Sequence, residues 1–287
     1  MRKLWIAAIA CLAAGIGCIA AVFPVRAGML SAFPAGGLYV LHTDSYLAVP
    51  REEGKFLFEM SVFEVKKGAY TPLLSYEDIC LLDASGSEWP AASVNLVPQF
   101  ADFSLNRTTV QLSLAIPEEE ARELVEFNRV RFSRGEEQTT LRLGSLKVEL
   151  VPQDAISDQA ATYEQTSTSS EFSLYRVSVY NLSATQELVM KRIRAPLAGA
   201  TCTQSLRIDA LGQDGPLENA VLPAKHQGVA TLRFTSDQPF CHNLIRPLIV
   251  FELDGREQCV VAGEYARYVS AMDRSQILAY LNGEAAQ

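Results

Sequence analysis

Cysteine and histidine side chains are the residues of this sequence that can bind a metal or supply a nucleophile and its base. Most of them fall in the second half of the chain, as Cys202, His226, Cys241, His242 and Cys259. Thiolate and imidazole are preferred zinc ligands, which makes Cys241, His242 and His226 the candidate metal ligands. Their spacing fits no Cys-x₂₋₄-Cys or His-x₃₋₅-His pair that one turn can present together, so we predict no bound metal or cofactor.

The cysteines also bear on the compartment in which the chain folds. Four of them, Cys80, Cys202, Cys241 and Cys259, lie outside the apolar N-terminal stretch. In an oxidising compartment four thiols allow three complete pairings, and sequence alone does not choose among them. We predict a disulfide between Cys202 and Cys241, with four buried free thiols as the alternative.

Nucleophilic catalysis needs a serine or cysteine within reach of a base, and bases are scarce here. The chain has 3 histidines, His42, His226 and His242. No Gly-x-Ser-x-Gly turn and no glycine-rich phosphate loop occurs. We therefore predict a non-catalytic protein. The alternative is an extracytoplasmic hydrolase or metal-dependent enzyme whose site residues are dispersed along the chain.

The charge of the chain excludes one large class of partner. The formal net charge is -8, and Arg2, Lys3 and Arg26 flank the N-terminal stretch, so the remainder is more acidic still. Non-specific nucleic-acid binding depends on lysine and arginine displacing counterions from phosphates. An acidic body repels such a polymer, so we predict no nucleic-acid partner.

Residues 1–35 predict a signal peptide or a membrane anchor. Leu4–Val25 contains no charged residue and, at about 1.5 Å per residue, is long enough to cross a hydrocarbon core of about 30 Å. Arg2 and Lys3 favour a cytoplasmic N-terminus, which places the body outside the cytoplasm. Cleavage, retention and lipidation of Cys18 stay open, because Gly15-Ile16-Gly17-Cys18 resembles a lipobox only in part. The protein is then either anchored by a single span or secreted.

From residue 36 onward the dominant pattern alternates between apolar and polar residues, which is typical of half-buried strands. Alternation predicts strands at 58–62, 110–116 and 128–134, and another over 139–150 with a bulge at Gly144-Ser145. Proline at the first position and three glutamates beside it predict a helix over 117–127.

The segment 83–103 predicts a long loop between strands. It carries Trp89 and Phe100, and loops of sandwich proteins are common places for recognition. Trp89 and Phe100 are therefore the candidate recognition residues. The alternative is that both side chains fold back and cap the core.

Residues 153–170 are polar and poor in large apolar side chains, which predicts a linker. Strand patterns resume at 172–180, 187–193, 206–210 and 230–234. The second half then offers the strongest local signal, two apolar runs over 247–261 joined by Asp254-Gly255, which predicts a tight hairpin. A final helix is expected from Asp273, as N-cap, to a stop at Gly283.

These patterns predict a mainly β fold in which two tandem antiparallel β-sandwiches of immunoglobulin-like type follow an N-terminal hydrophobic helix. The first sandwich spans 36–152, and the second spans 171–287 with the C-terminal helix. One larger sandwich or barrel is the alternative. The expected function is protein binding, or service as an accessory subunit of an envelope complex, with contact to the membrane through Leu4–Val25.

Overall fold

The computed structural model describes residues 31–164, 174–236, 241–263 and 265–285. It confirms a mainly β protein built from antiparallel sheets, and a C-terminal helix, α2 (Arg274–Ala285). Short 3₁₀ helices lie in the connections: η1 (Arg51–Glu53), η2 (Leu73–Ser75), η3 (Gln153–Ala155) and η4 (Asp209–Leu211). The hydrophobic run Leu4–Val25 lies outside the described residues. Within the described part, we find no helix with the length and apolar character needed to cross a membrane.

The first half of the chain forms most of one ten-stranded sheet. In order across the sheet, its strands are β1 (Gly37–Val40), β3 (Lys55–Val65), β6 (Leu105–Ala115), β5 (Glu88–Ala101), β4 (Asp78–Asp83), β7 (Leu124–Arg134), β8 (Glu137–Val151), β2 (Thr43–Pro50), β16 (His242–Arg246) and β19 (Ala266–Val269). Neighbours pair antiparallel, except that β2 runs parallel to both β8 and β16.

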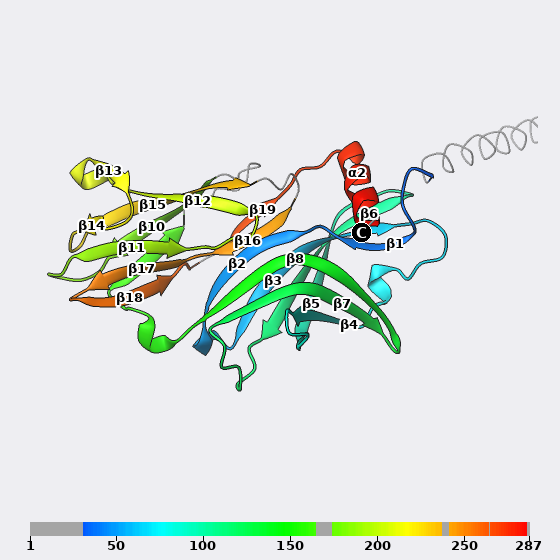
Figure 1. Cartoon of the computed structure of the whole chain (residues 1–287), viewed down its shortest axis with the longest axis horizontal. Helices are drawn as coiled ribbons and strands as arrows, with labels where there is room; N and C mark the ends of the chain where they lie inside the picture. The colour runs from blue at the N-terminus through cyan, green and yellow to red at the C-terminus, as the bar shows by residue number, and fades with distance from the viewer. Residues whose placement is uncertain (1–30, 165–173, 237–240, 264, 286–287) are drawn as a thin grey trace, which may run out of the picture.

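This sheet curls over on itself, so that β1 comes against β8 and one face is enclosed (Figure 1). The enclosed face carries the alternate apolar residues that the sequence pattern selects, such as Val110, Leu112 and Leu114 of β6, all fully buried. At the centre, Phe127 packs edge-on against Trp89 with ring centroids 5.2 Å apart. The alternation therefore sets which face of each strand enters the core.

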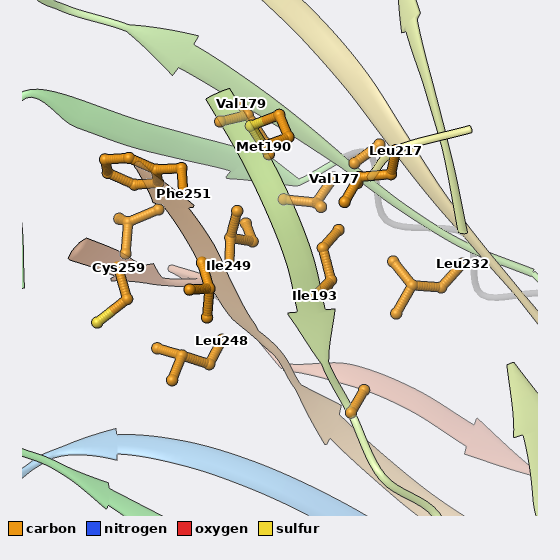
Figure 2. Packing of buried hydrophobic residues seen from close by; sticks show 14 of the residues in the cluster. Val177, Val179, Met190, Ile193, Leu217, Leu232, Leu248, Ile249, Phe251 and Cys259 are labelled. Carbon is orange, nitrogen blue, oxygen red and sulfur yellow. The ribbon is translucent and has the colours of Figure 1, made fainter. Parts of the chain in front are cut away.

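The second half forms two further sheets. One has five strands, β13 (Gln213–Pro216), β12 (Ala200–Ile208), β15 (Gln227–Ser236), β10 (Leu174–Asn181) and β9 (Ala160–Glu164); the other has four, β14 (Val221–Leu222), β11 (Leu188–Arg194), β17 (Leu248–Leu253) and β18 (Arg256–Val261). Both contribute to one core, in which Val177 and Leu232 of the larger sheet meet Ile249 and Phe251 of the smaller one (Figure 2). Residues 160–164, expected to belong to a linker, instead pair with β10 as β9.

The C-terminal third of the chain returns to the first sheet. β16 inserts between β2 and β19, with Ile245 opposite Tyr46 in parallel register. Asp44 reinforces this junction, because its buried carboxylate accepts hydrogen bonds from the backbone N–H groups of Ala198, at 2.6 Å, and Gly199, at 2.7 Å. Strand pairing thus joins the segments 36–152 and 171–287, which the sequence predicts to be tandem sandwiches.

Helix α2 starts as the sequence predicts. Asp273 caps it, since its carboxylate accepts a hydrogen bond of 2.9 Å from the backbone N–H of Gln276. Ile277 and Leu281 are buried and pack, with Phe63, on the outer side of β3. The predicted stop at Gly283 is wrong, because the helix continues to Ala285.

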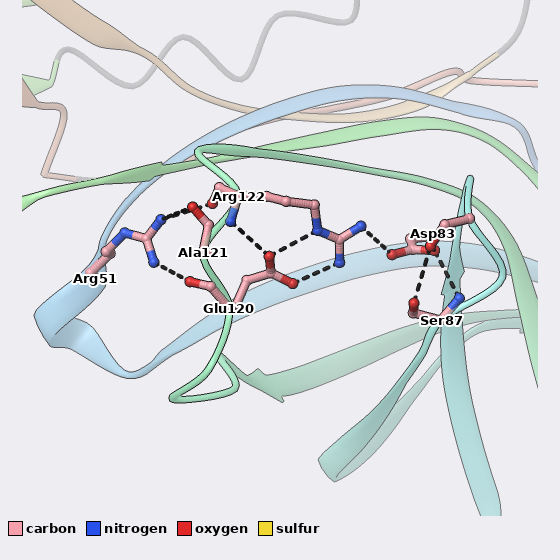
Figure 3. Close-up of polar contacts among 7 residues, drawn as sticks. Arg51, Asp83, Ser87, Glu120, Ala121 and Arg122 are labelled. Carbon is pink, nitrogen blue, oxygen red and sulfur yellow. Dashed lines mark hydrogen bonds and ion pairs between the residues drawn. The ribbon is translucent and has the colours of Figure 1, made fainter.

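The predicted helix over 117–127 is wrong: residues 116–123 are a loop and β7 begins at Leu124. Arg51 explains the loop, because its guanidinium donates hydrogen bonds to the carbonyls of Glu120, Ala121 and Arg122, which a helix would have needed (Figure 3). Arg122 in turn binds Asp83 and Glu120. Burial alone would raise the pKa of Asp83, but hydrogen bonds from Ser85, Arg122 and Ser87 lower it.

The predicted loop over 83–103 is also wrong, because residues 88–101 form β5. From Ser93 to Ala101 this strand pairs, within the described structure, with β6 alone. An edge of this kind tolerates Pro98, whose missing N–H would break a central strand. The prolines Pro90 and Pro98 make this edge strand resemble a long loop in the sequence.

Two local predictions in the strands are confirmed. Asp254 and Gly255 both adopt positive φ, 53° and 74°, and join β17 to β18 as a tight hairpin. β8 bulges at Gly144, where the register with β7 shifts between Phe127 and Arg129. Gly144 has φ +99°, and a Cβ there would stand 2.2 Å from the carbonyl oxygen of Thr43, so glycine is needed at this crossing.

Candidate functional site

A hollow of about 650 Å³ opens where β1 approaches β8 without pairing to it. Its walls come from the start of β1, the connection between β3 and β4, and the first residues of β8. We call it the tyrosine hollow and define it by Tyr39, Tyr70, Tyr76, Thr71, Glu137 and Thr139. Gly36 shapes one wall, because a Cβ at that position would lie 1.8 Å from the carbonyl oxygen of Lys67.

Each tyrosine of the hollow is held by its own hydroxyl. Tyr39 donates to the carbonyl of Ala35 at 2.9 Å, and the Tyr76 hydroxyl lies 3.0 Å from that of Thr139. Tyr70 donates to the carboxylate of Glu64 at 3.3 Å. Hydrogen bonds therefore restrain all three aromatic rings.

Glu64 supports the wall from behind. It is buried, and its second oxygen accepts a hydrogen bond of 2.8 Å from the backbone N–H of Leu73. Burial, followed by the charge and the hydrogen bond of Glu64, raises the pKa of Tyr70, so its hydroxyl stays protonated at neutral pH. The hollow therefore offers aromatic surface, neutral hydroxyls and one exposed carboxylate, Glu137. This composition suits recognition of a ligand rather than proton transfer.

The candidate metal ligands lie in two different places. Cys241 and His242 stand at the start of β16, whereas His226 precedes β15 and places its Nδ1 2.8 Å from the carbonyl oxygen of Ala224. Among the residues that the structure describes, no group of three or more His, Cys, Asp or Glu side chains is arranged to hold a metal ion.

The structure does not contain the predicted bridge between Cys202 and Cys241. Cys202 lies on β12, Cys241 hydrogen-bonds with Ser270 and Asn243, and all four cysteines of the described part are free thiols. Burial raises the pKa of Cys202 and of Cys241 to about 11 each. A thiol with a raised pKa is a poor nucleophile at neutral pH, so neither residue has the character of a catalytic cysteine.

His242 does meet a serine and a carboxylate. The Ser61 hydroxyl lies 3.1 Å from its Nδ1, and Glu59 lies 3.9 Å from its Nε2. The arrangement does not form a catalytic triad, because Ser61 and His242 are both fully buried and the carboxylate is beyond hydrogen-bond distance. Glu59 instead contacts Arg267 at 3.1 Å. These residues join β16 to the outer side of β3.

Burial, with smaller effects of Arg267 and Arg107, lowers the pKa of His242 to about 3. An unfolded histidine has a pKa near 6.5, so between about pH 6.5 and 3 the unfolded chain binds a proton that the folded chain does not. The contribution of neutral His242 to stability is therefore complete above about pH 6.5 and falls by about 1.4 kcal/mol per pH unit below it.

We expect the wild-type free energy of unfolding to fall by about 2 kcal/mol more than that of His242→Gln between pH 7.5 and 5.0. Urea unfolding at the two pH values measures this difference. His226→Gln lies away from the contact between His242 and Ser61 and is the control. Its free energy of unfolding should fall between the two pH values by as much as that of the wild type. An equal pH dependence of wild type and His242→Gln would contradict a buried neutral histidine.

The two candidate recognition residues differ in burial. Trp89 is buried in the first core, 3% exposed, whereas Phe100 is 39% exposed near the end of β5. Trp89 therefore stabilises the core, as the alternative interpretation held for it, and only Phe100 remains on the surface. Sequence reasoning missed the tyrosine hollow; its available signal was the pair Tyr70 and Tyr76 around the Thr71-Pro72 connection, close to Gly36-Gly37.

No protein-family model and no curated protein matches this chain. Among solved structures, the chain is similar to a protein of unknown function from Porphyromonas gingivalis W83. The identity is 11%, the match covers 78% of this chain and 95% of the other, and the TM-score is 0.22. Similarity at this level carries no inference about fold or function.

Proposed function

We propose that this chain is a non-catalytic, extracytoplasmic protein that binds a protein partner of the cell envelope through the tyrosine hollow. The observation that carries the proposal is the hollow itself, about 650 Å³ with three tyrosines in its lining. Tyrosine is enriched at the energetic centres of protein interfaces, since it supplies a large contact area with few rotatable bonds.

Preorganisation favours binding at this place. Because hydroxyl bonds already hold Tyr39, Tyr70 and Tyr76, a partner would not bear the entropic cost of ordering them, which is about 0.5–1.5 kcal/mol per side chain. The hydroxyl of Thr71 and the carboxylate of Glu137, which hydrogen-bond to each other at 2.7 Å, can exchange that bond for contacts with a partner.

The extracytoplasmic location is part of the proposal and rests on the sequence. Arg2 and Lys3 precede the uncharged run Leu4–Val25, which is the order expected of an export signal or anchor. The buried state of Ser61 and His242 supports the non-catalytic part, because neither side chain can reach a substrate.

We further propose that the five-stranded and four-stranded sheets of the second half form an immunoglobulin-like sandwich. The support is strand order: β9, β10, β15 and β12 are neighbours in one sheet, and β11, β17 and β18 are neighbours in the other. Lettered along the chain, these are strands A, B, E and D facing C, F and G, the arrangement of immunoglobulin constant domains. Such sandwiches host many unrelated functions, so this strand order supports an architecture and not an activity.

Site-specific photo-crosslinking tests the binding proposal. We expect a photoreactive residue at Tyr70, in the full chain expressed in its native cells, to crosslink to one envelope protein. The same substitution at Tyr163, 65% exposed on β9, is the matched control and should give no such product. Equal products from both positions, or none from Tyr70, would contradict a partner in the hollow.

Once a partner is identified, affinity provides the quantitative test. Tyr39→Ala with Tyr70→Ala should raise the dissociation constant by at least about 30-fold, as expected when an interface loses a residue worth about 2 kcal/mol. Tyr163→Ala should leave it unchanged. Recovery of the intact wild-type chain from the cytosol would separately contradict the proposed location.

A further inference from the structure

Three arginines gather on the outer face of the five-stranded sheet. Arg176 on β10 is paired in register with Thr231 on β15, which is paired with Ser205 on β12. Arg233 and Arg207 occupy the next outward positions on β15 and β12, diagonal to this row. The three arginines line one hollow of about 160 Å³ together with Ser205, Thr231, Val229 and one carboxylate, that of Asp214, which lies opposite Arg207 in register. We call this set the arginine patch: Arg176, Arg207, Arg233, Ser205 and Thr231.

The alternation of side chains along each strand fixes the direction in which these arginines point. Val177, Leu206 and Leu232 lie beside the arginines along the chain and enter the core between the two sheets. Because successive side chains of a strand point to opposite faces, the arginines must face outward. All three are exposed.

Two of the three arginines of the patch have no carboxylate partner within ion-pair distance among the described residues. Arg207 is paired with Asp209 at 2.8 Å, but neither Arg176 nor Arg233 forms an ion pair in the described part of the chain. Seven arginines outside the patch do pair with carboxylates: Arg122, Arg131, Arg192, Arg194, Arg246, Arg267 and Arg274. Arg176 and Arg233 lie on adjacent strands, where like charges repel one another. The chain as a whole has more acidic than basic residues, so the lack of partners is not a lack of carboxylates.

We propose that the arginine patch binds a single phosphate or sulfate group. Guanidinium groups bind tetrahedral oxyanions through paired N–H donors, and the Ser205 and Thr231 hydroxyls can donate from the floor of the hollow. A bound oxyanion removes the repulsion between Arg176 and Arg233. The hollow's size fits one such group at a time, whether it is a free ion or a group carried on a larger molecule. This site lies on a different sheet from the tyrosine hollow and does not depend on the proposed function.

Thermal unfolding of the full chain in non-ionic detergent tests the site, with inorganic phosphate as probe and sodium chloride at matched ionic strength as reference. A ligand that binds only the folded state raises the melting temperature in a saturable way. We expect saturation with phosphate and with sulfate, and not with chloride. Arg176→Gln and Arg233→Gln should each weaken binding about tenfold, the loss expected for one charge-assisted contact.

Arg256→Gln, an exposed arginine at the β17–β18 hairpin, is the matched control and should bind phosphate as the wild type does. Because sulfate and phosphate also stabilise proteins by exclusion from their surface, a rise that does not saturate, or is equal in Arg176→Gln/Arg233→Gln, would overturn the site.

The source of the anion is distinguished by comparing inorganic phosphate with dextran sulfate and with uncharged dextran. Tighter binding of dextran sulfate, lost in the double variant, supports a group carried on a polymer; binding of inorganic phosphate alone supports a free ion. Binding of uncharged dextran, or of none of the three, would overturn the proposal.

Discussion

Replacing Phe127 by alanine is expected to lower the free energy of unfolding by about 3–5 kcal/mol, the usual range for removing a buried phenylalanine. Phe127 is fully buried on β7, and its ring contacts Trp89 at 5.2 Å and Phe56 at 6.3 Å between centroids. These rings lie where the curled sheet closes on its own core, so neighbouring strands cannot collapse into the space. Urea unfolding followed by far-ultraviolet circular dichroism measures the loss.

Phe103→Ala is the matched control for Phe127→Ala. Phe103 carries the same side chain but is 44% exposed, in the turn between β5 and β6. We expect its replacement to cost less than about 1 kcal/mol, because nearly half of the residue's surface already contacts water. Losses of similar size in the two variants would mean that the rings around Phe127 are not the centre of the core.

Replacing Asp44 by alanine is expected to lower the free energy of unfolding by about 2–4 kcal/mol, because two hydrogen bonds to a charged acceptor are lost at once. The carboxylate of Asp44, a residue 3% exposed, accepts hydrogen bonds from the backbone N–H groups of Ala198 and Gly199, which belong to the second half of the chain. Fluorescence of Trp89 during urea unfolding is an informative probe, because Trp89 lies in the first core; the second tryptophan, Trp5, is replaced by phenylalanine in both proteins compared.

A shifted Trp89 transition in Asp44→Ala would mean that the two halves unfold together. Asp209→Ala removes a carboxylate from an exposed pair with Arg207 and should change the free energy of unfolding by less than about 1 kcal/mol. If Asp44→Ala left the Trp89 transition unchanged, the contacts of Asp44 would not couple the halves.

Local sequence patterns predict the elements whose two faces differ. In β6, alternation places Val110, Leu112 and Leu114 in the core, and Asp254-Gly255 specifies its hairpin because both positions need positive φ. Such signals depend on residues close together in the chain. For this reason the mainly β class could be predicted from the sequence.

The errors arise where distant residues decide the local structure. The helix expected after Pro117 is replaced by a loop because Arg51 binds the carbonyls of Glu120, Ala121 and Arg122. The loop expected around Trp89 is instead β5, an edge strand that tolerates proline. A short sequence window identifies neither Arg51 as the donor to these carbonyls nor the edge position of β5 in the sheet.

The candidate sites could not be predicted from the sequence for the same reason. The tyrosine hollow combines Tyr39 with residues of a later connection, and the arginine patch combines three strands. Sequence reasoning selected His242 for its chemistry, and the structure places it in a sealed contact with Ser61. Residue type therefore indicated what His242 could do, but burial decides what it does.

The position of β16 has a consequence for the order in which the molecule folds. Asp44 and Asn243 hydrogen-bond across 199 positions of the chain, and β2 and β16 lie side by side in parallel. Until the ribosome has made residues beyond 269, the nascent chain lacks part of its first sheet, first β16 and then β19. Contacts of such high contact order form slowly, so we expect native structure to be acquired after synthesis rather than along with it.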